Sequence, residues 1–102
     1  MRPIHLVRLD KTRPAVILTR EGVRPHMSRI TVAPIATRVR GLATEIQVGE
    51  VNGLDHDSVI NCDNIATVET ADIGRLIGFL LSDQEAELTR ALVAAFDLVA
   101  SG

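Results

Sequence analysis

The feature that most constrains the fold is a change of period along the chain. The first two thirds contain five short runs rich in β-branched and apolar residues, bounded by Pro, Gly, Asn or Asp, which favour turns. The runs occupy residues 4–9, 15–19, 29–33, 44–48 and 58–62. Strands at this spacing predict a small antiparallel sheet or barrel. Asn52-Gly53 is the strongest turn signal, and Pro34 predicts that the third strand ends there or leaves that amide unpaired.

The last third of the chain follows a helical period instead. Ser82 to Glu85 has the pattern of a capping box, in which each side chain accepts a hydrogen bond from the other residue's amide. Apolar residues then recur at intervals of three and four and form one stripe that can cover a sheet face. The stripe consists of Leu88, Ala91, Leu92, Ala95, Phe96 and Val99. We expect Phe96 in the core, and residues 72–81 fit either a short helical turn or a further strand.

Length and composition set the class of protein. A chain of 102 residues with 46% hydrophobic residues fits one domain over residues 1–102. No apolar run reaches the roughly 20 residues that span a bilayer, and no signal-peptide stretch opens the chain, so we expect a soluble cytoplasmic protein with no membrane contact. The single cysteine, Cys62, excludes an intrachain disulfide. Formation of a homodimer would supplement so small a core.

The charges are unevenly distributed. Although the net charge is −2, residues 1–40 hold nine of the eleven basic residues and only two of the thirteen acidic ones. Such asymmetry predicts a cationic surface that faces a polyanion, although solvated charges that merely cluster in the sequence fit it too. Arginine outnumbers lysine ten to one. Because guanidinium offers a planar fork to phosphate oxygens, this bias favours a nucleic-acid partner.

Several kinds of site are missing. The chain has no glycine-rich phosphate loop, so we expect no nucleotide cofactor. His5, His26 and His56 lie far apart without metal-ligand spacing, so we expect no metal. No Trp or Tyr is present, which removes the stacking platforms of general single-strand binders.

Three residues remain as candidates for catalysis. Arg13 precedes Pro14 and opens an apolar strand, so its guanidinium could point into a cleft, or it could be an ordinary surface arginine at a strand end. Asp63 follows an apolar run, which fits either a partly desolvated carboxylate or a turn residue. Thr37 is either a plain β-former or a hydroxyl close to a phosphate.

The order of the motifs resembles the MazF/Kid toxins of bacterial toxin–antitoxin pairs, and the start of the chain and its short first loop look like mycobacterial members. The likeness rests on Arg13-Pro14-Ala15-Val16-Ile17-Leu18-Thr19, residues 32–37, residues 53–68, Leu76-Ile77-Gly78 and the final helix. The resemblance implies a barrel-like, SH3-like sheet with a C-terminal helix, and a homodimer neutralised by a MazE-like or other antitoxin. The implied activity is metal-independent, sequence-specific cleavage of single-stranded RNA, which inhibits translation and growth.

The resemblance also implies a mechanism, in which the ribose 2′-hydroxyl attacks the adjacent phosphate and leaves a 2′,3′-cyclic phosphate. Arg13 matches an arginine that stabilises phosphate charge, and Asp63 matches a carboxylate that acts as an acid or base. Ala36 stands where the family usually has Thr or Ser, so Thr37, one position on, is the candidate for that hydroxyl. We expect the phosphate contacts from basic residues of the first half, namely Lys11, Arg20, Arg24, Arg38 and Arg40.

Two alternatives stay open at this point. One is a binding module without catalysis, such as the gyrase-poisoning CcdB relatives that share this fold. The other is an inactive scaffold retained for dimerisation. The arginine bias favours RNA, whereas Ala36 favours either alternative.

Overall fold

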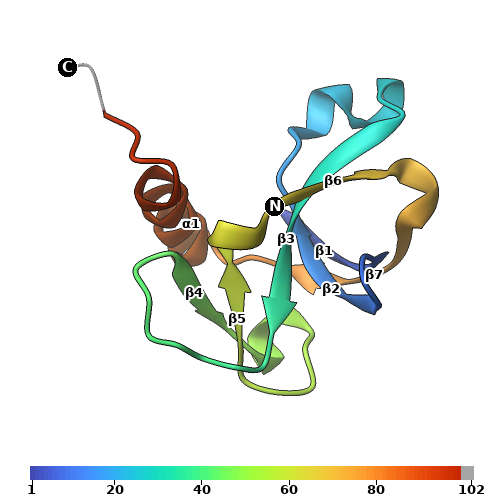
Figure 1. Cartoon of the computed structure of the whole chain (residues 1–102). Helices are drawn as coiled ribbons and strands as arrows, with labels where there is room; N and C mark the ends of the chain where they lie inside the picture. Colours follow the sequence, from blue (N-terminus) through green and yellow to red (C-terminus); the bar gives the residue numbers. More distant parts are fainter. Residues whose placement is uncertain (100–102) are drawn as a thin grey trace.

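The computed structural model describes residues 1–99 and consists of a curled antiparallel sheet with one α-helix (Figure 1). The strands are β1 Pro3–Arg8, β2 Thr12–Ile17, β3 Arg29–Ala36, β4 Glu45–Val48, β5 Ser58–Asn61, β6 Ala66–Glu69 and β7 Ile73–Phe79. The helix is α1 Ser82–Ala95, and four short 3₁₀ turns are η1 Glu21–His26, η2 Glu50–Asn52, η3 Cys62–Asn64 and η4 Thr70–Asp72. Within the described residues, no helix is long and apolar enough to cross a membrane. The architecture expected from the sequence, mainly β with a C-terminal helix, is confirmed.

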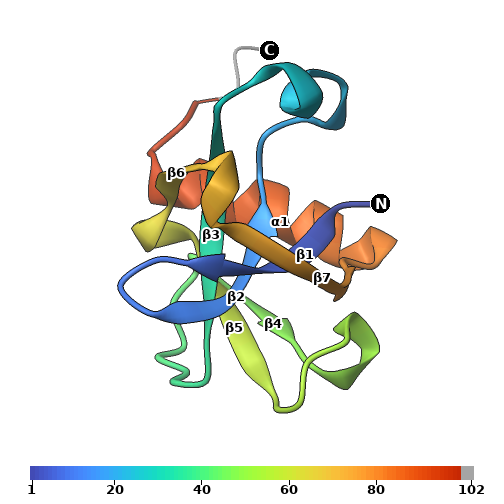
Figure 2. The same cartoon turned by 90° about the vertical axis from the view of Figure 1, so that its right-hand side faces the viewer.

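Strand β3 organises the sheet, whose order is β4-β5-β3-β2-β1-β7. One edge of β3 pairs with β2. Its other edge pairs first with β6, up to Val32 opposite Ala66, and then with β5, from Ile35 opposite Ile60. Because one strand serves two ladders, the sheet curls on itself, as Figures 1 and 2 show.

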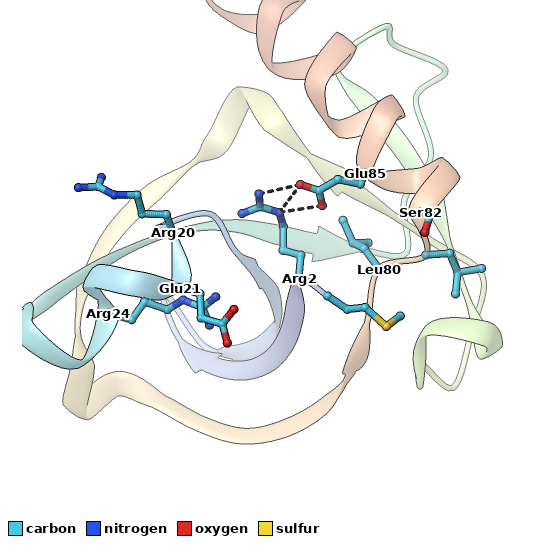
Figure 3. Close-up of a pocket in the computed structure, with 9 residues that line it drawn as sticks. Arg2, Arg20, Glu21, Arg24, Leu80, Ser82 and Glu85 are labelled. Atoms are coloured by element: carbon cyan, nitrogen blue, oxygen red, sulfur yellow. Dashed lines mark hydrogen bonds and ion pairs between the residues drawn. The ribbon is translucent and has the colours of Figure 1, made fainter.

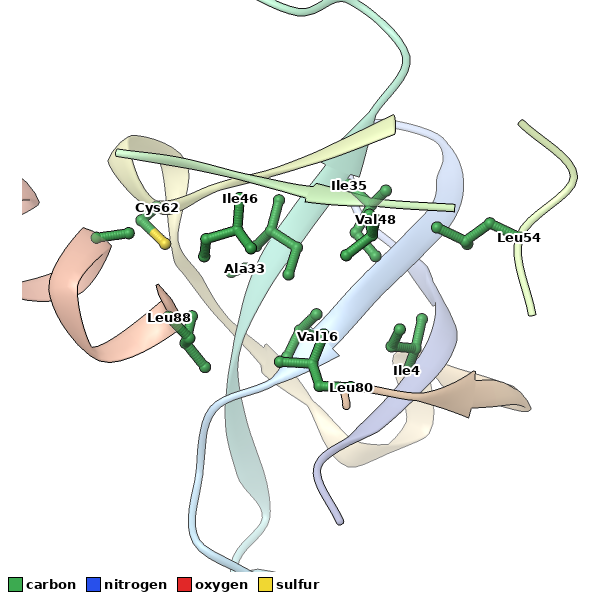
Figure 4. Close-up of a cluster of buried hydrophobic side chains, with 12 residues drawn as sticks. Ile4, Val16, Ala33, Ile35, Ile46, Val48, Leu54, Cys62, Leu80 and Leu88 are labelled. Atoms are coloured by element: carbon green, nitrogen blue, oxygen red, sulfur yellow. The ribbon is translucent and has the colours of Figure 1, made fainter. Parts of the chain in front are cut away.

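Two apolar clusters hold the curled sheet together. The larger lies between the sheet and α1 and includes Ile4, Val16, Ile60 and Leu88 (Figure 4). The smaller consists of Val7, Ala15, Ile17, Ile30 and Val32, with Val68 and Ile73 packed against it. Successive β2 side chains point to opposite faces, and both faces are covered. This double burial explains why residues 15–18 read as a continuous apolar run rather than an alternating one.

The structure adds one strand to those expected and decides between the two alternatives for Pro34. Strand β6 was missed, because only Val68 and Ala66 of its four residues face apolar surroundings even in part. Strand β3 does not end at Pro34 but continues to Ala36. Pro34 falls in the gap between the β6 and β5 ladders, a position compatible with a residue that cannot donate a hydrogen bond. In the open segment at residues 72–81, Asp72 belongs to the short 3₁₀ turn η4 and residues 73–79 form strand β7.

The helix begins differently from the predicted capping box. Leu81, not Ser82, is the N-cap, and its amide donates to Gln84 Oε1 at 3.0 Å. The Glu85 carboxylate accepts from Arg2 instead of capping the helix. Phe96 is not in the core, because α1 ends one residue earlier and leaves 52% of Phe96 exposed.

A buried polar network joins the start of α1 to the rest of the fold. Asn52 accepts from the Gly49 amide at 3.0 Å and donates to the Phe79 carbonyl at 2.9 Å. Its side chain also bonds Gln84, which in turn donates to the Gln47 carbonyl. Gly78 packs against the Asn52 carbonyl so closely that no Cβ would fit there.

Candidate active site

Arg13 lies near the start of β2, next to the turn that joins β1 to β2, and pairs with Val7 of β1. Its side chain is 24% exposed, and Nη2 donates to Asp10 Oδ2 at 3.0 Å. The Asp10 side chain is 74% exposed, so this ion pair contributes little stability and can exchange for another anion. The Arg13 Nε is buried and has no hydrogen-bond partner within the described residues. Arg13 is therefore a partly buried cation whose ion pair in the described chain is with an exposed carboxylate.

Thr37 lies at the same end of the sheet as Arg13. The β2–β3 ladder ends with Ala15 opposite Pro34, two residues from Arg13 on β2 and two residues from Ala36 on β3. Strand β3 ends at Ala36, and Thr37 is exposed immediately beyond it. Because Thr37 is outside the strand, the alternation of the pleat does not force its hydroxyl away from Arg13.

The predicted RNA-binding residues separate into two groups. Lys11, in the β1–β2 turn, and Arg38, just after β3, are exposed at the same end of the sheet as Arg13. Arg40 is exposed farther along the loop, where its amide donates to the carboxylate of Glu45 at the start of β4. We call Lys11, Arg13, Thr37 and Arg38 the hairpin end of the molecule.

Arg20 and Arg24 lie at the other end of β2. Leu18 and Thr19 donate to the Thr31 carbonyl at 2.8 and 3.3 Å, which places this end of β2 five residues from Ala36 along β3. Five residues of strand correspond to roughly 17 Å. Figures 1 and 2 show the light blue segment η1, which carries Arg24, at the opposite end of the molecule from the last residues of β3.

Asp63 does not join Arg13 within one chain. Asp63 lies in η3, directly after β5, and β5 pairs with the edge of β3 that is opposite β2. Its carboxylate accepts from Thr44 Oγ1 at 2.6 Å, and its amide donates to Asn61 Oδ1 in an Asx turn. The expectation of a desolvated carboxylate is wrong, because the residue is exposed; the alternative of a turn residue fits.

Cys62 is buried in the core beside this turn. Burial, with a smaller contribution from the charge of Asp63, raises the pKa of its thiol to about 11. The thiol is therefore protonated near neutral pH and is a poor nucleophile and metal ligand. In the part of the chain that the structure describes, no three His, Cys, Asp or Glu side chains group as a metal site.

Arg2 has a structural role that was not predicted from the sequence. Its guanidinium binds the Glu85 carboxylate with contacts of 2.7 and 2.9 Å and donates to the carbonyls of Ile17 and Leu18 at 3.0 Å each. The hydrogen bond from Arg2 lowers the pKa of Glu85, and the charges of Arg2 and the terminal ammonium add to this against the effect of burial. No local sequence pattern predicts this ion pair, because Arg2 and Glu85 are 83 residues apart.

Comparison with known proteins places the chain in a family. The model of the PemK-like, MazF-like toxin of type II toxin–antitoxin systems matches residues 6–96. Endoribonuclease MazF3 of Mycobacterium tuberculosis is 59% identical over 98 residues, which cover 96% of this chain and 95% of that protein.

Solved structures agree with this assignment. The Mycobacterium tuberculosis toxin MazF-mt6 superposes with a TM-score of 0.95 at 57% identity, covering 97% of this chain and 100% of that one. A mycobacterial endoribonuclease in complex with its cognate antitoxin shares the fold, with a TM-score of 0.87 at 20% identity over 97% of this chain and 95% of that one. The chain therefore belongs to the PemK-like, MazF-like toxins of type II toxin–antitoxin systems.

Proposed function

We propose that this toxin is a cytoplasmic endoribonuclease that cleaves single-stranded RNA at the hairpin end without a metal ion. The observation that carries the proposal is the half-buried Arg13, whose Nε lacks a partner in the described chain and whose neighbour beyond β3 is the exposed Thr37. The identity of 59% with an endoribonuclease of Mycobacterium tuberculosis supports the same activity. Lys11 and Arg38 extend the positive charge around Arg13, as a phosphate-binding surface requires.

The reaction that fits these groups is attack by a ribose 2′-hydroxyl on the adjacent phosphorus. The O2′–P bond forms while the P–O5′ bond breaks, the 2′-hydroxyl loses its proton, and the departing 5′-oxygen gains one. Negative charge grows on the non-bridging oxygens, where the Arg13 fork can donate two parallel hydrogen bonds. Since an arginine stays protonated in proteins, Arg13 acts through charge rather than as a base. The Thr37 hydroxyl supplies a further donor to the same oxygens.

Asp63 has no part in this mechanism within one chain. The carboxylate lies on the opposite edge of β3 and is already bonded to Thr44. Asp63→Asn is therefore expected to leave both limbs of the pH–rate profile in place. Loss of one limb would assign Asp63 the acid or base role and would mean that a second copy of the chain supplies it.

The active form is proposed to be a homodimer that a cognate antitoxin neutralises. Several large apolar side chains remain exposed on one chain, among them Leu76, Phe79, Val93, Phe96 and Leu98. A standard interface of about 1,600 Å² would cover such surface. The structural relative solved with its antitoxin supports an inhibitor of that kind. Light scattering at micromolar concentration tests the dimer, and a mass of 11 kDa would contradict it.

The test of the activity combines RNA mapping with one variant. Purified protein incubated with total RNA in EDTA should create new 5′-hydroxyl ends. Arg13→Ala should slow single-turnover cleavage at saturating RNA by about 10² or more, the scale for losing one preorganised donor, and Arg13→Lys should restore little. Arg75→Ala, which removes an exposed arginine of β7, is the matched control. Equal rates for Arg13→Ala and the wild type would refute the proposed role of Arg13.

The absence of a hydroxyl at Ala36 favours one other candidate, a toxin-fold scaffold that binds without cleaving. The two functions differ in the same experiment. If the protein binds RNA or antitoxin but creates no new 5′-hydroxyl ends at any RNA concentration, the scaffold function is favoured over cleavage.

A further inference from the structure

A basic pocket lies at the end of β2 that is remote from Arg13. Its walls come from η1, the N-terminal residues, the β7–α1 connection and the first turn of α1, and it encloses about 420 Å³ (Figure 3). The pocket is about as large as a small-ligand site, and it is open to solvent. None of its lining residues belongs to the hairpin end.

The pocket carries more positive than negative charge. Arg20, Arg24 and the Met1 ammonium line it and form no ion pair there, since the described ion pairs are Arg2–Glu85 and Arg13–Asp10. Glu21 is the one lining carboxylate left after Arg2 has taken Glu85. The balance of the free groups is therefore positive.

The donors in the pocket also have unused capacity. The Nε of Arg24 is buried and has no hydrogen-bond partner within residues 1–99. A buried donor without a partner is unfavourable, and an acceptor that reached this Nε would satisfy it. Arg2, in contrast, donates hydrogen bonds to Glu85 and to the carbonyls of Ile17 and Leu18. Its guanidinium therefore forms part of the pocket wall and is not counted among the groups that bind a ligand.

We propose that this pocket is a second phosphodiester subsite, which holds the RNA strand several nucleotides away from the bond cleaved at Arg13. This inference rests on the proposed function. A guanidinium group suits the oxygens of a phosphodiester, and Arg20 and Arg24 each supply one from η1 or its N-cap. The roughly 17 Å along β3 from Thr31 to Ala36 corresponds to a few nucleotides. No aromatic side chain lines the pocket, so recognition there is of the backbone rather than of bases.

The first test detects phosphate at the pocket itself. Inorganic phosphate titrated into the 15N-labelled protein should shift the Nε–Hε signals of Arg20 and Arg24 saturably. The backbone amides of Leu81 and Ser82, which also line the pocket, should shift with them, and these amide shifts should disappear in the Arg20→Gln/Arg24→Gln double variant. The signal of Arg75, exposed on β7, should not move and serves as the control. Unchanged Arg20 and Arg24 signals would overturn the subsite.

The second test asks whether RNA occupies the pocket. Binding of a 2′-O-methyl RNA, which cannot be cleaved, is measured against salt concentration. Each lost phosphate contact should reduce the log–log slope by about 0.7, so the double variant should lose about 1.4 and Arg20→Gln alone about 0.7. Arg20 is exposed, so its variant remains informative if the double variant does not fold. Arg75→Gln should keep the wild-type slope.

The outcomes separate this inference from the proposed function. Slopes that match the wild type in both pocket variants would overturn the RNA subsite, and so would a pocket that takes an acidic peptide but no RNA. If the wild type cleaves no RNA while the phosphate shifts and slope changes appear as expected, the proposed cleavage fails and the phosphodiester subsite stands.

Discussion

Replacement of Asn52 by alanine should destabilise the toxin more than any exposed polar substitution, because Asn52 is 1% exposed and uses its whole amide. The side chain accepts from the Gly49 amide and donates to the Phe79 carbonyl, at 3.0 and 2.9 Å. Both backbone groups lose this partner in Asn52→Ala. Gln84 is less affected, since it still accepts from Leu81 and donates to the Gln47 carbonyl.

The size of the effect follows from these two orphaned groups. A buried polar group left without a partner costs roughly 1 to 3 kcal/mol, so the loss of both amounts to about 4 kcal/mol. Domains of this size have a total stability of about 5 to 15 kcal/mol. At roughly 4 to 8 °C per kcal/mol, Tm should fall by about 15 to 30 °C.

Urea unfolding followed by circular dichroism measures this loss, at one fixed protein concentration because a dimer would make stability depend on it. Asn64→Ala is the matched control, since Asn64 is exposed at the end of η3. In the double variant with Gln84→Ala the two losses should not add, because the side chains bond each other at 2.6 Å. A loss below about 1 kcal/mol for Asn52→Ala would refute the reasoning.

Three further predictions concern other groups. Gly78→Ala should destabilise by at least about 2 kcal/mol, since its Cβ would collide with backbone, whereas Gly22→Ala, with open space around it, should not; equal urea midpoints would contradict this. Because burial raises the pKa of Cys62 to about 11, Ellman's reagent at pH 8 should react at least about 10² more slowly with native than with urea-unfolded protein, and comparable rates would count against burial. Since the folded-state pKa of Glu85 is lowered by Arg2, the stability lost in Glu85→Gln should be present at pH 7 and vanish as acid protonates Glu85 below about pH 4; a loss that persists at pH 2 would exclude this linkage.

The sequence was sufficient for the parts of the fold that local patterns encode. Five of the seven strands appear as apolar runs between turn residues. The residues of the α1 stripe that pack on the core, namely Leu88, Ala91, Leu92 and Ala95, follow the helical period. Strand β6 has no such pattern, because it pairs with β3 while exposing Thr67 and Glu69. The predicted capping box at the helix start was wrong for a similar reason. Glu85 binds Arg2, and these two residues come together only when the chain folds.

For the candidate site too, local sequence could predict some features, and others depend on contacts between residues far apart in the chain. The neighbours of Arg13 predict its place at the start of a strand, because a following proline favours extended backbone, while its role in catalysis came from the resemblance. Whether Asp63 reaches Arg13 depends on which edge of β3 pairs with β5 and in which register. The pairing of Ile35 with Ile60 carries Asp63 back along β3, away from Ala36. No spacing within residues 58–68 encodes that displacement. The order of the motifs alone suggests that Arg13 and Asp63 act together, whereas in the folded chain they lie on either side of β3, on the β2 edge and the β5 edge.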